Sequence, residues 1–396
     1  MNADDGLSFA TTAECDRSGA RCGRLRTPHG TVETPVFVPC ATRGALKGIT
    51  AEQAAATGAQ MLLANTYHLF LQPGPEAVAA RGGLHRFMNW PRPLLTDSGG
   101  FQIFSFGHGS VADEIKGRRK QRQSPAAVEL TEEGAAFRSY VDGRRVFLSP
   151  EGAVEAQQRI GADLIVVLDE CTPYHVDREY TARSMERSHR WGLRGLERFR
   201  ETDDGRQGLY GIVQGGVYED LRAESSAFVA GQPFFGQAIG GSLGSDPAQM
   251  EEVVAWSRAG LPRERPTHLL GIGGIRDLWR NAAHGIDSFD CVHPTRLARH
   301  GGALCVPGEN GGQEHLNLRN ARFRDDPRPL DERVPHPASR EYSRAYLHYL
   351  VRAGESLGGQ LLALHNLAFL AWMMERLRES IREGRFPEEA GNWTGA

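Results

Sequence analysis

The run Leu164-Ile-Val-Val-Leu-Asp169 decides how the rest of this sequence is interpreted. It is short, apolar, rich in β-branched residues and closed by a carboxylate, which is typical of a buried strand that ends at a polar site. A helical stretch at 179–200 follows, and then a second run of the same kind, Leu209-Tyr-Gly-Ile-Val-Gln214. A strand, a helix and a strand in this order predict a parallel βαβ unit.

The same alternation extends in both directions along the chain. Helical segments lie between successive runs, for example 50–57 with Thr50 as N-cap and 149–160 introduced by Ser149-Pro150. Eight runs are predicted as strands: Pro35–Cys40, Met61–Asn65, Pro93–Asp97, Leu164–Asp169, Leu209–Gln214, Gly236–Gly240, His268–Gly271 and Ser288–Cys291. Eight such units predict an α/β protein with a TIM (β/α)8 barrel at 9–301, because an open doubly wound sheet needs no closing eighth strand.

Two stretches interrupt the alternation. Residues 107–150 contain a basic cluster at 116–122 and a hairpin signal around Asp142-Gly143, so we expect an insertion over the mouth or side of the barrel. Residues 302–387 follow the eighth run. We predict them as a C-terminal subdomain packed on the barrel, with two helices at 343–355 and 357–383.

The composition is that of an ordinary folded protein. The 396 residues are 40% hydrophobic and 24% charged with a net charge of −3, which argues against disorder and against a wholesale polycation. The six cysteines are dispersed and form no C-x-x-C pair, which favours a reducing compartment. No apolar stretch approaches the roughly 18 residues of a membrane span and the acidic N-terminus lacks an export signal, so we expect a cytoplasmic protein without a membrane anchor.

Polar residues close several of the predicted strands: Asn65, Asp97, Asp169, Gln214 and Asp290. A single Asp or Asn at such a position often only caps the following helix. Three carboxylates that end different strands of one barrel, however, converge on its mouth, where burial and mutual repulsion adapt them for acid, base or nucleophile work. The pattern therefore favours an enzyme. No complete phosphate-loop or H-E-x-x-H spacing occurs, so we predict neither a nucleotide cofactor nor a catalytic metal.

Six motifs resemble those of one enzyme family. They are Thr34-Pro-Val-Phe-Val-Pro39, Leu63-Ala-Asn-Thr-Tyr-His-Leu69, Thr96-Asp-Ser-Gly-Gly-Phe-Gln102, Asp169-Glu-Cys-Thr-Pro-Tyr174, Gln214-Gly-Gly-Val-Tyr-Glu-Asp-Leu-Arg222 and Phe289-Asp-Cys-Val-His-Pro-Thr-Arg296. In this order they resemble the queuine tRNA-ribosyltransferases, also called tRNA-guanine transglycosylases, over nearly the whole chain. The resemblance implies a homodimeric TIM-barrel enzyme that binds the tRNA anticodon loop. It would exchange the wobble guanine for a 7-deazaguanine base, either 7-aminomethyl-7-deazaguanine or queuine.

The resemblance also implies roles for individual residues. Asp290 matches the nucleophile that attacks the ribose anomeric carbon, and Asp97 matches the acid/base that helps one base leave and the other enter. A covalent aspartyl intermediate gives net retention through two inversions. The positions that match the base pocket are Ser98, Gly99, Gly100, Phe101, Asp169, Gln214, Gly241 and Leu270. The positions that match the anticodon-loop contacts are Gly271, Ile272, Gly273, Gly274, Ile275, Arg276, Asp277, Thr295, Arg296, Leu297, Ala298 and Arg299.

The sequence departs from the family pattern at its C-terminal zinc site. The family has three cysteines spaced C-x-C-x-x-C and a histidine in a later helix. Here Val334, His336 and Ser339 stand at the cysteine positions, and only His365 is retained. Because valine cannot ligate, we predict no structural zinc and no other cofactor. A weak site made by His336 and His365 alone is the alternative.

A second departure follows Gly240-Gly241. Bacterial members commonly run Gly-Gly-Leu-Ser/Ala-Val-Gly-Glu, whereas this chain continues Ser242-Leu-Gly-Ser-Asp246. Gly244 stands where the resemblance places a valine that limits the incoming base. One hypothesis is a wider pocket, and the other is a rerouted loop in which Leu243 refills the space.

The residues leave three functions open. Base exchange in tRNA is the favoured one, the same exchange on DNA or a free nucleoside is the second, and a non-catalytic RNA-binding paralogue is the third. The presence of both Asp97 and Asp290 argues against the third, because a silent subunit would be free to lose either.

Overall fold

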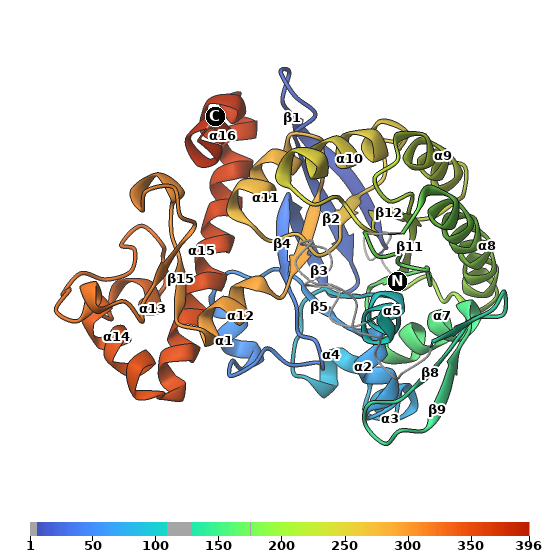
Figure 1. The fold of residues 1–396 in the computed structure, drawn as a ribbon, viewed down its shortest axis with the longest axis horizontal. Helices are drawn as coiled ribbons and strands as arrows, with labels where there is room; N and C mark the ends of the chain where they lie inside the picture. Colours follow the sequence, from blue (N-terminus) through green and yellow to red (C-terminus); the bar gives the residue numbers. More distant parts are fainter. Residues whose placement is uncertain (1–5, 109–127, 175, 396) are drawn as a thin grey trace.

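A computed structural model describes residues 6–108, 128–174 and 176–395 of the chain (Figure 1). Its main sheet has eight parallel strands in the order β4-β14-β13-β12-β11-β10-β6-β5. They are β4 (Val36–Pro39), β5 (Leu62–Ala64), β6 (Leu94–Thr96), β10 (Leu164–Val166), β11 (Gly208–Val213), β12 (Gly236–Ile239), β13 (Thr267–Leu269) and β14 (Ser288–Cys291). The two outer strands meet where Cys40 pairs with Leu63. The sheet therefore nearly closes on itself, and the predicted TIM barrel is confirmed.

Each predicted strand run overlaps an observed strand. The strands are buried on both faces, as all six residues of β11 are, because side chains fill the barrel interior and helices cover its outside. Glycines make room for large rings between neighbouring strands. A Cβ on Gly236 of β12 would lie 2.4 Å from the ring of Tyr210 on β11, so only glycine fits opposite this tyrosine.

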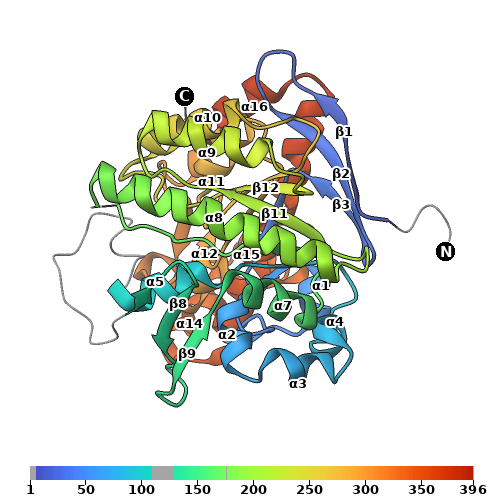
Figure 2. The same ribbon diagram turned by 90° about the vertical axis from the view of Figure 1, so that its right-hand side faces the viewer.

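Helices alternate with the strands and surround them (Figures 1 and 2). They are α1 (Ala51–Ala56), α2 (Thr66–Leu71), α3 (Pro75–Ala79), α4 (Gly83–Phe87), α5 (Gly100–His108), α7 (Pro150–Ile160), α8 (Arg178–Thr202), α9 (Glu219–Ala230), α10 (Pro247–Ala259), α11 (Ile275–Ala282) and α12 (His293–Arg299). The two predicted caps are confirmed. Thr50 and Gln53 form a capping box on α1, and the Ser149 hydroxyl accepts from the Gly152 N–H at the start of α7.

An antiparallel sheet that we did not predict precedes the barrel: β1 (Ser8–Glu14), β2 (Arg21–Thr27) and β3 (Gly30–Thr34). A buried ion pair fastens it to the barrel, since Arg21 Nε donates to Asp287 Oδ1 at 3.0 Å just before β14. Its β2–β3 turn also reaches the N-terminal ends of the barrel strands. There, Asp163 faces Nδ1 of His29 at 2.7 Å and Nε2 of His85 at 3.0 Å.

The insertion between β6 and β10 contains the predicted hairpin. It consists of β8 (Ala135–Arg138) and β9 (Arg145–Leu148), and β7 (Glu129–Leu130) pairs with β8 as a third strand. Figure 1 shows the hairpin beside α2, α3 and α7. The basic cluster at 116–122 lies outside the described residues.

The C-terminal segment lies against one side of the barrel. It holds β15 (Gly302–Leu304), β16 (His315–Asn317), the 3-10 turns η1 (Pro307–Glu309) and η2 (Ala321–Phe323), α13 (Pro337–Arg340), α14 (Arg344–Ala353), α15 (Ser356–Arg382) and α16 (Phe386–Thr394). The two predicted helices correspond to α14 and α15, whereas α16 was not predicted. Trp393 of α16 stacks on Trp279 of α11, with ring centroids 5.5 Å apart.

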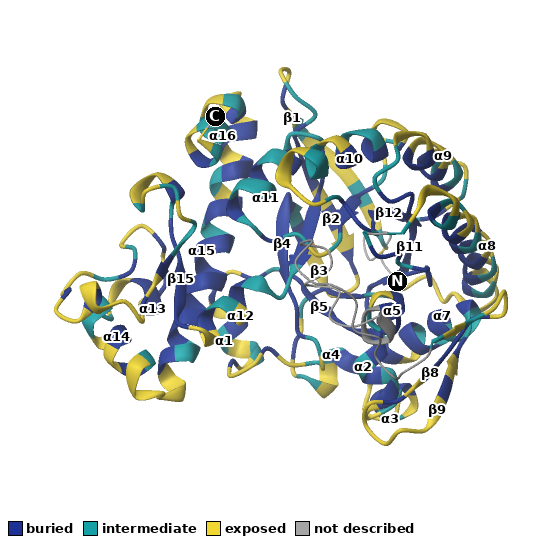
Figure 3. Ribbon diagram, viewed as in Figure 1, coloured by how far each residue is buried: buried dark blue, intermediate teal, exposed yellow. Residues whose placement is uncertain are grey.

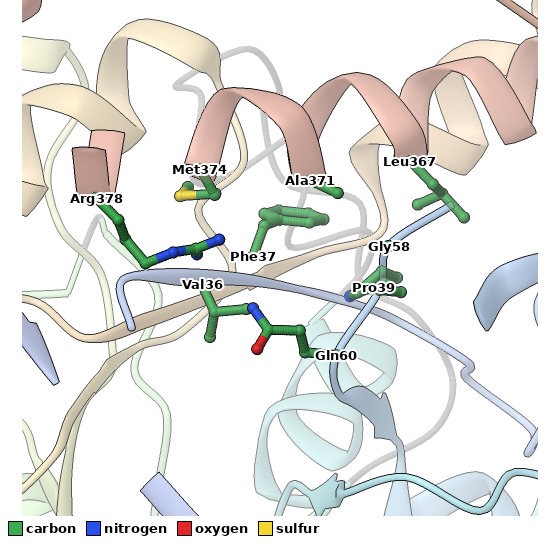
Figure 4. A pocket seen from close by; sticks show the side chains of 10 residues that line it. Val36, Phe37, Pro39, Gly58, Gln60, Leu367, Ala371, Met374 and Arg378 are labelled. Atoms are coloured by element: carbon green, nitrogen blue, oxygen red, sulfur yellow. The ribbon is translucent and has the colours of Figure 1, made fainter. Parts of the chain in front are cut away.

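Helix α15 is the central element of this segment. It packs on α12, β4 and β15 and is buried along most of its length (Figure 3). In the described chain it is the one helix long and apolar enough to cross a membrane, but 72% of that apolar window is buried inside the protein. Figure 4 shows its contact with β4, where Phe37 lies under Ala371 and Met374 beside a hollow of about 20 Å³. This hollow is a packing gap and holds none of the expected site residues.

Candidate active site

The structure brings the polar strand ends together at the C-terminal mouth of the barrel. Asp97 follows β6, Asp169 follows β10, Gln214 follows β11 and Gly241 follows β12, while Asp290 lies within β14. The carboxyl groups of Asp97, Asp169 and Asp290 are close enough to interact electrostatically. The barrel topology therefore brings these residues together at one end of the sheet.

Asp97 is held from three directions. Its Oδ1 accepts from the Thr66 N–H at 2.9 Å, and its Oδ2 accepts from the side-chain amides of Asn65 and Gln102, the latter at 2.8 Å. Burial nevertheless dominates and raises the pKa of Asp97 to about 6, against the lowering effect of these hydrogen bonds, and the charge of Asp290 raises it further. A carboxyl with this pKa exchanges protons readily near neutral pH, as an acid/base requires.

Asp169 and Gln214 form a buried polar edge. Gln214 Nε2 donates to Asp169 Oδ2 at 2.5 Å, and the Ser98 hydroxyl donates to Asp169 Oδ1 at 3.2 Å. Burial raises the pKa of Asp169 to about 6. Among the described residues, Gln214 Oε1 has no hydrogen-bond partner although it is buried. An unpaired buried acceptor is costly, so this edge is suited to a ligand that presents N–H donors.

Two glycines lie close against the side chains of Asp169 and Gln214. A Cβ on Gly100 would lie 2.9 Å from Asp169 Oδ1, and one on Gly241 would lie 2.3 Å from Gln214 Oε1. Gly241 also has a φ of +75°, which favours glycine. Phe101, 41% exposed, and the half-buried Leu270 are the apolar residues expected at the pocket walls.

Arg222 organises the loops after β11 and β12, a role that the sequence analysis missed. Its guanidinium is fully buried and donates to the carbonyl groups of Gly216, Gly240 and Ser242 at 2.7–2.9 Å. Burial lowers the pKa of Arg222 to about 9. Arg222 ends the motif at 214–222, but the sequence could not show that its partners are backbone carbonyls.

Asp290 has neighbours that the sequence analysis also missed. Its Oδ1 accepts from the Gly271 N–H at 3.0 Å and lies 3.1 Å from Nε2 of His268. Its Oδ2 accepts a weaker bond from the Cys40 thiol at 3.4 Å. His268 is buried in β13, where a lone histidine in an apolar run is easily taken for a core residue.

The segments expected to contact RNA lie on the same rim. Arg296 and Arg299 are exposed on α12, directly after β14. Among the described residues, Arg299 Nη1 donates to the Thr295 carbonyl of its own helix at 3.0 Å. Both guanidinium groups can therefore reach a phosphate. Arg276 differs, because its guanidinium already donates to Gly312 O at 2.7 Å and Thr394 O at 3.2 Å.

Comparison with known proteins agrees with this geometry. The family model described as queuine tRNA-ribosyltransferase matches residues 15–395. The chain belongs to this family. It is 49% identical over 399 residues to the queuine tRNA-ribosyltransferase of Roseiflexus sp. (strain RS-1), which covers 98% of this chain and 99% of that relative. It is 45% identical to the queuine tRNA-ribosyltransferase of Cyanothece sp. (strain PCC 7425 / ATCC 29141), over 98% of this chain and 95% of that relative. It is 42% identical to that of Bacillus subtilis (strain 168), over 97% of this chain and 94% of that relative.

The positions of the family's zinc ligands do not fit a metal in this chain. Val334 is fully buried and apolar. The Ser339 hydroxyl and Nδ1 of His365 lie 2.9 Å apart, and Nε2 of His365 lies 2.9 Å from the Leu304 carbonyl. His336 Nδ1 accepts from the Ala338 N–H at 3.1 Å. Both nitrogens of His365 therefore have partners within the protein, and none of the three positions 334, 336 and 339 carries a thiol.

One group in the described chain has the residue types and spacing of a metal site: His29, His85 and Asp163. The two imidazole rings stack at 3.5 Å with 13° between their planes, so their nitrogens point side by side instead of converging on one ion. Each carboxylate oxygen of Asp163 already pairs with one ring, and the Leu94 N–H also donates to Oδ2 at 2.8 Å. We interpret the cluster as a hydrogen-bonded closure of the barrel's N-terminal end.

The loop after β12 favours the second of our two hypotheses about Gly244. Its φ is +107°, and a Cβ there would lie 2.6 Å from Gln249 Oε1 on α10. Leu243 is 6% exposed and belongs to the core. A side chain at 244 would thus meet α10, and the hypothesis of a wider base pocket loses its basis.

Proposed function

We propose that this protein exchanges the guanine at the wobble position of tRNA for a 7-deazaguanine base through a covalent aspartyl-ribose intermediate. The observation that carries the proposal is the arrangement of Asp290 and Asp97 beside the buried edge of Asp169 and Gln214. A nucleophile, an acid/base and a base-recognition edge are the parts that glycosyl exchange on a flipped base requires.

The reaction runs in two symmetric halves. In the first, Asp290 attacks C1′ of the ribose while the bond from C1′ to N9 of guanine breaks, and Asp97 supplies the proton that guanine takes up. In the second, Asp97 accepts the N9 proton of the incoming base, which displaces Asp290 from C1′. The raised pKa of Asp97, about 6, suits both proton transfers. Two inversions at C1′ give net retention.

The pocket edge recognises what guanine and 7-deazaguanine share. Both bases present N–H donors on the same edge of the pyrimidine ring, and Asp169 and Gln214 Oε1 are buried acceptors. Phe101 and Leu270 supply apolar surfaces for the base faces, and Gly241 admits the base close to the backbone. An ionised Asp169 strengthens these bonds, because charge-assisted hydrogen bonds are the stronger ones.

RNA binding is assigned to the rim segments 271–277 and 295–299. Arg296 and Arg299 contact phosphates of the anticodon loop, since both are exposed on α12, the helix that follows the strand of Asp290. Arg276 shapes the loop from within, through its bonds to the C-terminal segment.

The C-terminal subdomain, 302–387, is held without zinc. The Ser339 hydroxyl donates to Nδ1 of His365, and Nε2 of His365 donates to the Leu304 carbonyl. These hydrogen bonds occupy the place of the metal, and Val334 packs into the core. Burial lowers the pKa of His365 to about 4, so the imidazole stays neutral at physiological pH and fits this arrangement.

The enzyme acts in the cytoplasm as a homodimer. Tyr346 and Tyr349 of α14 are 40% and 62% exposed, and Leu357 at the start of α15 is 39% exposed. Large apolar side chains exposed on two consecutive helices support contact with a second copy.

Labelled guanine tests the proposed function directly. Incubation with a panel of tRNAs, with matched DNA hairpins and with free nucleosides should give incorporation only into tRNA with a wobble guanine. Asp290→Asn should abolish both guanine exchange and any RNA adduct that survives denaturation, because the amide is a poor nucleophile. An active Asn variant would remove Asp290 from its role, and incorporation into DNA or nucleosides would change the acceptor.

A further inference from the structure

The two oxygens of Asp290 lie in unequal surroundings. Oδ1 accepts from the Gly271 N–H at 3.0 Å and faces Nε2 of His268 at 3.1 Å. Among the described residues, Oδ2 has the Cys40 thiol at 3.4 Å. A thiol is a weak donor compared with an amide or imidazole N–H, so negative charge on Oδ2 is the less stabilised of the two.

Hydrogen bonding also fixes the orientation of His268. Its Nδ1 lies 2.8 Å from the hydroxyl of Ser288, which stands two residues before Asp290 on β14 and so shares its face of the strand. The carboxylate can only accept, so Nε2 carries the proton toward Asp290 and Nδ1 accepts from Ser288. His268 is 1% exposed, so the ring is held inside the protein with this orientation.

We infer that Oδ2 of Asp290 is the atom that bonds to C1′, and that His268 is a positioning residue which holds the carboxylate through Oδ1. This inference rests on the proposed function, because it takes Asp290 as the nucleophile. An oxygen held by two N–H donors is a poorer nucleophile than its neighbour, and the same two bonds fix the direction in which the neighbour points.

The bonds to Oδ1 persist through the reaction. When Oδ2 bonds to C1′, the C1′–N9 bond breaks, its electron pair leaves with guanine, and Asp97 supplies the proton. Oδ1 becomes the carbonyl oxygen of the ester and still accepts from Gly271 and His268. In the second half the incoming base releases the carboxylate, whose charge these donors stabilise.

Cys40 provides a matched pair of variants. Cys40→Ser places a stronger hydroxyl donor against Oδ2 and should slow adduct formation about two- to tenfold, the effect of one added hydrogen bond. Cys40→Ala removes the donor and should speed the same step. The order of rates Ala, Cys, Ser is expected only if Oδ2 is the attacking atom. A Ser variant as fast as the Ala variant would overturn the assignment.

His268 is tested by conservative rescue. In a single-turnover assay of adduct formation with full-length protein, His268→Leu should lower the rate about 10–100-fold while KM for tRNA stays constant. His268→Gln should recover part of the loss, because its amide can donate to Oδ1. Equal rates for the Leu and Gln variants would overturn the positioning role. If the Leu variant does not fold, the Gln variant and the Cys40 pair still decide the inference.

The outcomes separate this inference from the proposed function. Mapping of the trapped adduct to Asp290, together with an inactive Asp290→Asn variant, supports the nucleophile independently of any result at Cys40 or His268. Normal rates in all Cys40 and His268 variants, with the adduct still on Asp290, would refute only the assignment of Oδ2 and the positioning role.

Discussion

Replacing Asp169 with asparagine should stabilise the protein in a pH-dependent way. Burial raises the pKa of Asp169 from 3.8 to about 6. A carboxyl whose pKa is raised on folding contributes most below its unfolded pKa, and the contribution is lost as pH rises toward the folded pKa. A pKa difference of about two between the folded and unfolded states lowers the free energy of unfolding by about 3 kcal/mol between pH 4 and pH 6. Above pH 6 this loss of stability stays constant.

The asparagine variant removes this loss because it carries no charge at any pH. The amide also fits the site: its oxygen can accept from Gln214 Nε2, and its NH2 group can donate to the Ser98 hydroxyl oxygen in place of the bond that Asp169 accepts. The free energy of unfolding should therefore be similar to that of the wild type near pH 4, and higher by up to about 3 kcal/mol at pH 8. Base exchange should fall, because a neutral amide accepts hydrogen bonds from the base more weakly.

Urea denaturation at several pH values between 4.5 and 8 is the assay, with Asp163→Asn as the matched control. Burial raises the pKa of Asp163, but the hydrogen bonds from His29 and His85 outweigh it and lower the pKa to about 2. This carboxylate stabilises the fold above pH 4, so its asparagine variant should lose about 2 kcal/mol throughout the range. A stability difference for Asp169→Asn that does not change with pH would refute the reasoning.

Three further predictions concern the rim, the β12 loop and the C-terminal subdomain. Arg296→Ala or Arg299→Ala should weaken tRNA binding and flatten its salt dependence by about one unit of slope, whereas Arg183→Ala on the outside of α8 should change neither. Gly244→Val should destabilise the fold by about 1–3 kcal/mol, since the φ of +107° disfavours valine, without changing the outcome of competition between queuine and 7-aminomethyl-7-deazaguanine. A shift toward the smaller base would restore the wider-pocket hypothesis. Elemental analysis should find no stoichiometric zinc in the purified protein, and one zinc per chain retained against a chelator would contradict the assignment of Val334 and its neighbours.

The strands could be predicted from sequence because each is a local pattern. Runs such as Leu164–Asp169 combine burial on both faces with a polar end, and the caps at Thr50 and Ser149 are fixed by residues three positions away. The sheet β1–β3 carries a weaker version of the same signal, since the alternation of buried and exposed residues in β2 is partial. Its attachment through Arg21 and Asp287 joins positions 266 residues apart, which no local pattern contains.

The residues of the candidate site likewise include some that the sequence could predict and some that it could not. Asp97, Asp169 and Gln214 could be placed in one mouth because the barrel topology brings strand ends together. The roles of His268 and Arg222 could not be predicted from the sequence, because each role depends on which atoms the side chain contacts in the folded protein. His268 looks like a core histidine until Asp290 is seen 3.1 Å away, and Arg222 looks like a surface arginine until its carbonyl partners are known.

Buried aspartates at the two ends of the barrel have opposite effects on stability. At the N-terminal end, Asp163 pairs with His29, His85 and the Leu94 N–H, and its lowered pKa stabilises the fold. At the mouth, Asp169 has a raised pKa and Gln214 Oε1 has no described partner, so the unliganded site destabilises the fold. A base that donates to these acceptors stabilises the folded state. Binding and folding are therefore linked, and the bases that stabilise the protein against unfolding should be those that the pocket recognises.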